Sequence, residues 1–172
     1  MTTPTHQAKR PVSSLLAGPY GHPFHPILVT VPIGAWVASL VFDVASRFVD
    51  DPGFLTQGSG WLIAIGSIGA AAAAMTGFLD LFAIPTGTRA FRTGLVHMGL
   101  NLAITTAYVV NFLWRQGNSN EESVALGPLL LSAVSMATLA VSGYLGGKLA
   151  YHYGVRVAEE STQAEGFSSH HM

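Results

Sequence analysis

The chain has 172 residues, of which 49% are hydrophobic and only 10% are charged, whereas a soluble domain carries about 25% charged residues. So few charges cannot cover a water-facing surface, and the composition therefore favours a lipid bilayer as the solvent. The formal net charge of −1 gives no basic surface for nucleic acid, and the absence of cysteine excludes disulfides, thiolate metal sites and iron–sulfur clusters.

Apolar stretches long enough to cross a bilayer dominate the middle of the chain, since a crossing needs about 20 helical residues. Residues 1–20 are expected to be a polar lead-in, residues 21–157 a four-span transmembrane domain, and residues 158–172 a disordered polar tail. The four spans are predicted at about 26–49, 61–84, 91–114 and 124–147. Because the connections are short, we expect an all-α integral membrane four-helix bundle in which successive helices are antiparallel neighbours.

The first span begins with two His-Pro pairs, at His22 and His25. Proline lacks an N–H and moves the preceding residue away from the helical region, whereas it can begin a helix at no cost. Two imidazoles are therefore expected at the N-terminal end of the first span.

Lysine and arginine are unequally divided between the two sides of the predicted bundle. The side of the chain ends carries six of them, Lys9, Arg10, Arg89, Arg92, Lys148 and Arg156. The opposite side carries two, Arg47 and Arg115. Basic residues favour the cytoplasmic side, so the pattern predicts a multi-pass protein with both termini in the cytoplasm.

Polar groups within the spans are costly in hydrocarbon unless they are paired or functional. The predicted topology brings six of them near the cytoplasmic face from all four spans: His22, His25, Asp80, His97, Asn101 and Tyr144. Asp43 lies in the outer half of the first span, and its spacing to Arg47 predicts an ion pair at the interface.

Three interpretations of this His/Asp/Asn cluster remain open. In the first, Asp80, Asn101 and Tyr144 orient their neighbours or tie the helices together, and the protein has a structural or interaction role. In the second, His25 and His97 are axial ligands of haem b in a redox-associated subunit. In the third, His22, His25, His97 and Asp80 form a non-haem metal site, or the cluster serves a small transporter or proton relay.

Small residues repeat every four positions in the second span, at Gly69, Ala73 and Gly77. This spacing lets helices approach closely, so we expect it to line the closest helix–helix contact. The sequence holds no nucleophile elbow, phosphate loop or H-E-x-x-H motif, and enzyme activity has no direct support.

Several motifs, in the same order, resemble the DUF2231 family of predicted bacterial membrane proteins. They are His22-Pro-Phe-His25-Pro-Ile-Leu-Val-Thr-Val-Pro32, Gly77-Phe-Leu-Asp80, Gly94-Leu-Val-His97-Met-Gly-Leu-Asn101 and Ser142-Gly-Tyr through Tyr151 with Gly154-Val. The resemblance extends from Gly21 to Val157 and implies a four-span domain in a bacterial cytoplasmic membrane. Some relatives carry a Rieske-type domain, which implies a redox partner protein. Thr30 stands where many relatives have a further histidine, which leaves His25 and His97 as the usable pair.

Overall fold

The computed structural model describes residues 4–117 and 122–167, and within these ranges every regular element is a helix. The elements are α1 (Pro4–Lys9), α2 (Ser14–Ala17), α3 (His25–Leu28), α4 (Thr30–Ala45), α5 (Gly53–Ala83), α6 (Arg89–Arg115), α7 (Leu126–Gly147), the π-helical turn η1 (Lys148–His152) and α8 (Glu160–Glu165).

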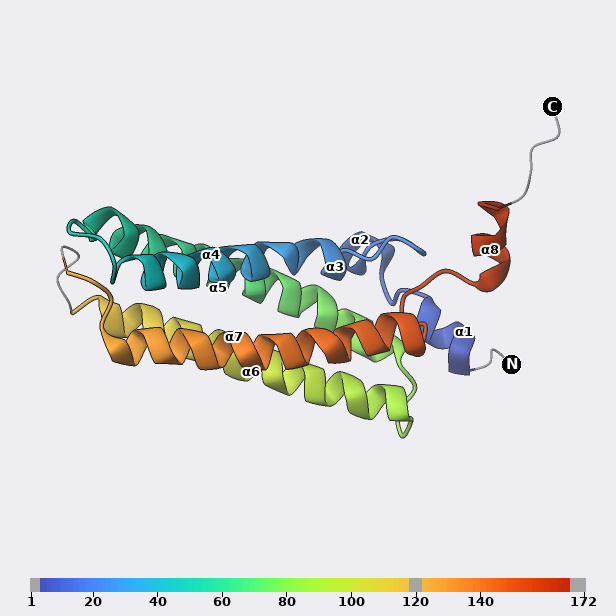
Figure 1. Ribbon diagram of the computed structural model, residues 1–172. Coiled ribbons are helices and arrows are strands. Elements are labelled where there is room, and N and C mark those ends of the chain that lie inside the picture. Colours follow the sequence, from blue (N-terminus) through green and yellow to red (C-terminus); the bar gives the residue numbers. More distant parts are fainter. Residues whose placement is uncertain (1–3, 118–121, 168–172) are drawn as a thin grey trace, which may run out of the picture.

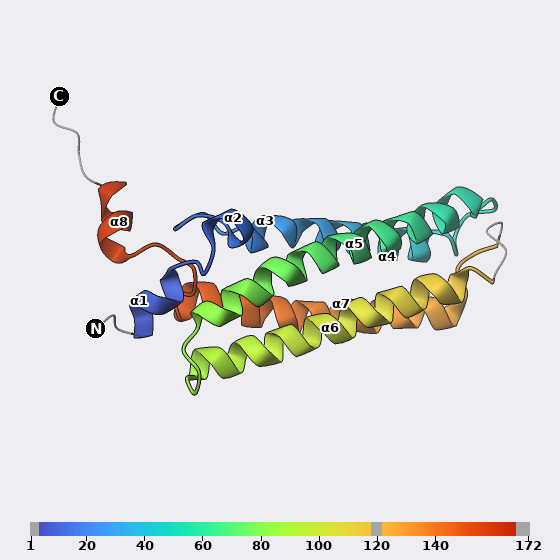
Figure 2. The same cartoon turned by 180° about the vertical axis from the view of Figure 1, so that it is seen from behind.

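Four long helices run side by side along the molecule (Figures 1 and 2). Helix α5 packs against α4 and α6, and α7 packs against α6 and α4. Four segments of the described chain are long and apolar enough to cross a membrane: His25–Ala45, Gly53–Ala83, Arg89–Arg115 and Leu126–His152. The prediction of an all-α membrane four-helix bundle is therefore confirmed. Helices α1 and α8 lie at one end, here called the terminal end; α4 is followed by α5 at the other, the loop end (Figure 1).

The helix bounds differ from the predicted spans where polar residues or proline intervene. Helix α5 begins at Gly53, directly after Pro52, and not near 61. Its first turns carry Thr56 and Ser59, which lower the hydropathy there, although Ser59 is fully buried. The first crossing ends at Ala45 and not at 49, and the last continues beyond 147 as η1 to His152.

Helices α3 and α4 together form the first crossing, with a break at Val29. Pro32 has no N–H to donate to the carbonyl of Leu28, so the regular helical ladder is interrupted there. The ladder resumes where the Ile33 amide donates to the Val29 carbonyl at 3.3 Å. The short helix α3 therefore carries His25 as a separate turn at the terminal end.

An aromatic pair fills the middle of the bundle. Trp36 of α4 and Tyr108 of α6 stack with ring centroids 4.1 Å apart and planes 10° apart, and both are almost fully buried. Gly66 of α5 makes room for this stack, since a Cβ there would overlap the Trp36 indole. Ile63, Ala70 and Ile104 complete this core.

The lead-in and the tail pack on each other at the terminal end. Ala8, Ile84 and Val155 form a buried apolar cluster, and the Arg156 amide donates to the Ala8 carbonyl at 3.0 Å. The expected polar lead-in therefore contains two short helices, and the expected disordered tail contains α8; residues 168–172 of that tail lie outside the described residues. We call residues 4–20 and 153–159 the terminal cap.

Candidate functional site

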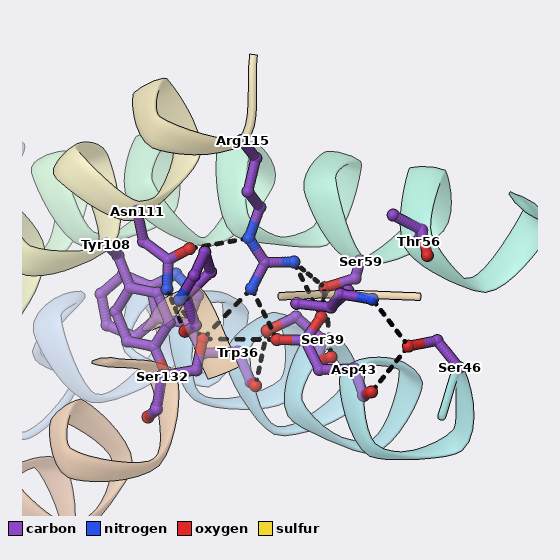
Figure 3. Close-up of polar contacts among 12 residues, drawn as sticks. Trp36, Ser39, Asp43, Ser46, Thr56, Ser59, Tyr108, Asn111, Arg115 and Ser132 are labelled. Atoms are coloured by element: carbon purple, nitrogen blue, oxygen red, sulfur yellow. Dashed lines mark hydrogen bonds and ion pairs between the residues drawn. The ribbon is translucent and has the colours of Figure 1, made fainter. Parts of the chain in front are cut away.

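Polar side chains inside the bundle gather in two layers, one near each end, with the Trp36–Tyr108 stack between them. The layer at the loop end is centred on a buried ion pair between Asp43 of α4 and Arg115 of α6 (Figure 3). Nη1 and Nη2 of the arginine donate to the two carboxylate oxygens at 2.8 and 2.6 Å, while Asp43 is fully buried and Arg115 is 9% exposed. Such a two-pronged contact is the strong form of a charged hydrogen bond.

Neutral side chains complete this layer from the other helices. The Ser59 hydroxyl of α5 donates to the Asp43 carboxylate, and Arg115 Nε donates to Asn111 Oδ1 at 2.7 Å. The Asn111 amide donates to the Ser132 hydroxyl of α7 at 2.9 Å (Figure 3). One hydrogen-bonded network therefore joins α4, α5, α6 and α7, which offsets the cost of burying the two charges.

The expected pairing of Asp43 with Arg47 is wrong. Arg47 Nη1 donates instead to the Val124 carbonyl at 2.8 Å, and the Asp43 carboxylate forms its ion pair with Arg115. The spacing rule considers partners one turn away on the same helix, whereas this partner comes from another helix of the bundle.

The layer at the terminal end contains the histidine pair. His25 of α3 and His97 of α6 lie with ring centroids 6.3 Å apart and planes 89° apart. His25 Nδ1 donates to the Ala73 carbonyl of α5 at 2.8 Å, and His97 Nδ1 donates to the Ser142 carbonyl of α7, also at 2.8 Å. A proton fixed on Nδ1 leaves the Nε2 lone pair of each neutral ring as its acceptor or ligand atom.

Asn101 stabilises the His97 side of this layer without using that lone pair. Its amide nitrogen donates to the His97 carbonyl and to the Ser142 hydroxyl, both at 2.8 Å. The same nitrogen is nearly equidistant from the two ring nitrogens of His97, at 3.4 and 3.3 Å, so it lies over the ring face. Asn101 therefore fixes the ring and the α6–α7 contact together.

Glycine provides the space for both imidazoles. A Cβ on Gly77 would lie 2.9 Å from His25 Nδ1 and Cε1, and one on Gly146 would lie 3.1 Å from His97 Cε1. On the same face of α5, a Cβ on Gly69 would lie 2.6 Å from Val31 Cγ1, and Ala73 is buried. The small-residue face of α5 is thus the face that contacts α3 and α4.

Asp80 pairs with Arg156, and no hydrogen bond or ion pair joins it to either histidine within the described residues. Its Oδ1 lies 2.7 Å from Nε of Arg156, which is 4% exposed. Arg156 Nη2 also donates to the carbonyls of Ala17 and Gly18 at 3.0 and 2.9 Å. Asp80 therefore holds the terminal cap on the end of α5.

Two other candidate residues, His22 and Tyr144, are exposed on the surface of the bundle. The His22 side chain is exposed, with Nδ1 3.4 Å from the Tyr20 carbonyl, and Tyr144 is 72% exposed. The described residues contain no group of three or more His, Asp or Glu side chains that could hold a metal ion. The four-residue ligand set of His22, His25, His97 and Asp80 is therefore not assembled.

Sequence reasoning missed three residues that organise these layers: Arg115, Ser142 and Arg156. Arg115 and Arg156 were counted only as loop charges, although each ends in a buried pair. Ser142 binds His97 partly through its main-chain carbonyl, which a side-chain pattern cannot reveal. The one feature of the sequence that pointed to Ser142 was its place in the Ser-Gly-Tyr motif.

The family model described as a predicted membrane protein (DUF2231) matches residues 21–159, which include both polar layers. The chain belongs to the DUF2231 family. Comparison with curated proteins and with solved structures gives no match. In this DUF2231 protein, the matched region also includes Arg156 and Glu159 of the terminal cap, whereas α1 and α2 precede it.

Proposed function

We propose that this DUF2231 protein is a redox-associated subunit of a bacterial cytoplasmic membrane, and that His25 and His97 together bind one metal centre, either haem iron or a single ion. The observation that carries the proposal is the pair of neighbouring, perpendicular imidazoles, each with its Nδ1–H bound to a main-chain carbonyl and with ring centroids 6.3 Å apart.

The separation of the rings fits ligation from two sides. An imidazole–metal bond of about 2 Å, plus about 1 Å from nitrogen to ring centre, gives about 6 Å between the two ring centres. A ligating histidine generally donates its other N–H to a carboxylate or carbonyl, and here the Ala73 and Ser142 carbonyls accept those protons. Neutral imidazole suits iron, copper, zinc and haem alike.

A structural role is the second candidate, and one observation favours it. His25 already links α3 to α5, and His97 links α6 to α7, through the same two hydrogen bonds. Interhelical hydrogen bonds of this kind can hold a membrane bundle without any ligand.

Replacement of each histidine by glutamine separates the two roles, because glutamine keeps hydrogen bonding but is a poor ligand. The parent, His25→Gln and His97→Gln are purified in mild detergent and examined by visible spectroscopy for haem and by elemental analysis for metal. We expect one centre per chain in the parent and none in either variant, while the helical circular dichroism is retained. His22→Gln, which changes an exposed histidine nearby, should bind as the parent does.

The contrary result is equally definite. A parent that carries no haem or metal after reconstitution, together with a His97→Gln variant that loses only about 1 kcal/mol of stability, supports the structural role.

We infer further that both chain ends face the cytoplasm. Arg115 and Arg156 lie in buried ion pairs and do not report on sidedness. The remaining basic residues are Lys9, Arg10, Arg89, Arg92 and Lys148 at the terminal end, and Arg47 at the loop end. This asymmetry supports a cytoplasmic terminal end. A redox partner protein would then approach the histidine pair from the cytoplasmic side.

A further inference from the structure

A groove with a volume of about 460 Å³ lies at the terminal end, where α1 and the residues after it meet the end of α5. Its lining includes the basic residue Arg10 with His6, and the apolar residues Val12 and Phe82. Figure 2 shows α1 beside the end of α5, outside the four-helix bundle. The groove therefore combines one arginine with apolar lining residues.

The depth of the groove in a bilayer follows from the length of α5. Its 31 residues span about 46 Å at 1.5 Å per residue. A bilayer is about 30 Å thick in its hydrocarbon core and 40–45 Å thick with its headgroups. For an α5 centred in the bilayer, this length places the last residues of the helix, including Phe82, at headgroup level.

Apolar side chains around the groove are exposed at this same level. Phe82 and Val12, which both line the groove, are 60% and 50% exposed. A cluster of this kind next to a membrane-spanning helix is suited to contact with lipid acyl chains.

Arg10 is positioned at the groove and is only weakly paired. Its guanidinium stacks over the Tyr20 ring at 4.8 Å, and Nη2 is 3.9 Å from Glu159 Oε1, beyond hydrogen-bond distance. Glu159 instead accepts a hydrogen bond from His6 Nδ1 at 2.8 Å. The Arg10 side chain is 66% exposed, so the N–H donors of its planar guanidinium remain accessible to a phosphate group.

We propose that this groove binds a phospholipid with an anionic headgroup. The phosphate lies beside Arg10, and an acyl chain follows Val12 and Phe82 into the bilayer. The terminal cap thereby contacts the membrane surface as well as the bundle. This site is separate from the histidine pair, since neither His25 nor His97 lines the groove.

The test uses native mass spectrometry of the full chain in detergent, titrated with phosphatidylglycerol or with phosphatidylcholine of the same acyl chains. The parent should retain phosphatidylglycerol preferentially. Arg10→Gln should weaken that binding by about tenfold, the loss expected for a charge-assisted hydrogen bond. Arg92→Gln is the matched control, because it removes the same charge from an exposed position at the same end, and it should bind as the parent does.

Glu159→Gln provides a second test that does not depend on the folding of the Arg10 variant. Removing the negative charge beside Arg10 should strengthen phosphatidylglycerol binding. Equal retention of the two lipids by the parent, or equal loss in Arg10→Gln and Arg92→Gln, would overturn the proposal. Displacement of phosphatidylglycerol by millimolar inorganic phosphate would also overturn it, because the groove would then bind a free anion and not a lipid.

Discussion

A charge buried in a membrane bundle is stable only while its partner and its hydrogen bonds remain in place. Asp43 satisfies this condition through Arg115 and Ser59, and Arg115 through Asn111 as well. Asp80 and Arg156 form the second buried pair, which connects α5 to the terminal cap. At the scale of single residues, the molecule depends on these two pairs.

Asp43→Asn should therefore lower the free energy of unfolding by about 3–5 kcal/mol, because it leaves the Arg115 charge buried without its counter-ion. Denaturant titration in detergent micelles, followed by circular dichroism, measures the loss. Asp50→Asn, at an exposed position in the α4–α5 connection, should change the stability by less than about 0.5 kcal/mol.

The double variant Asp43→Asn/Arg115→Gln gives a further check on the pairing. Since it removes both charges, it should cost less than the sum of the two single changes. Strict additivity would contradict the ion pair.

At the scale of elements, the small-residue face of α5 sets the distance to α3 and α4. Gly69 and Gly77 lie where a Cβ would meet Val31 and the His25 ring. Backbones that approach this closely also bring the Ala73 carbonyl within reach of His25 Nδ1. Helix packing and imidazole orientation therefore depend on the same face.

Gly77→Leu should consequently destabilise the bundle by about 1–3 kcal/mol through overpacking, and it should displace the His25 ring. Thermal unfolding in detergent measures the first effect. Gly60→Leu is the matched control on the same helix, because a Cβ there meets no atom within 4 Å. If both variants melt at the same temperature, the close contact of α5 with α3 does not contribute to stability.

The sequence was sufficient to predict the four long apolar helices, because they depend on a local pattern of hydropathy. The start of α5 was missed because Thr56 and Ser59 are polar, and only tertiary packing buries Ser59. The carbonyls that orient the two imidazoles carry no side-chain signature. The partner of Asp80 follows the last span in a segment with no helical periodicity, where Arg156 adopts a φ of 59°.

At the scale of the whole molecule, both ends of the described chain lie at the terminal end, on the side where most of the basic residues lie. Helices α1 and α8 are drawn at this end in both views (Figures 1 and 2). An even number of crossings requires this arrangement. The orientation of the bundle then decides which compartment receives the cap.

Reporter fusions should place both ends in the cytoplasm, as the asymmetry of lysine and arginine predicts. A fluorescent protein fused to either terminus should be active, and alkaline phosphatase fused to either terminus should be inactive. Phosphatase inserted after Asp51, in the α4–α5 connection, should be active. Opposite locations for the two termini would contradict the four-span bundle itself.

The Asp43–Arg115 pair also has a consequence for biogenesis. The two residues are 72 positions apart in the chain, so at 5–20 residues per second the ribosome adds the arginine about 4–14 s after the aspartate. During that interval the first crossing carries an unmatched carboxylate, and it cannot reach its final environment until the third crossing arrives. Ser132 follows later still, on the fourth. Insertion of this protein is therefore completed only when the third and fourth crossings have been synthesised. In a chain truncated before Arg115, the Asp43 carboxylate of the first crossing would remain without its counter-ion.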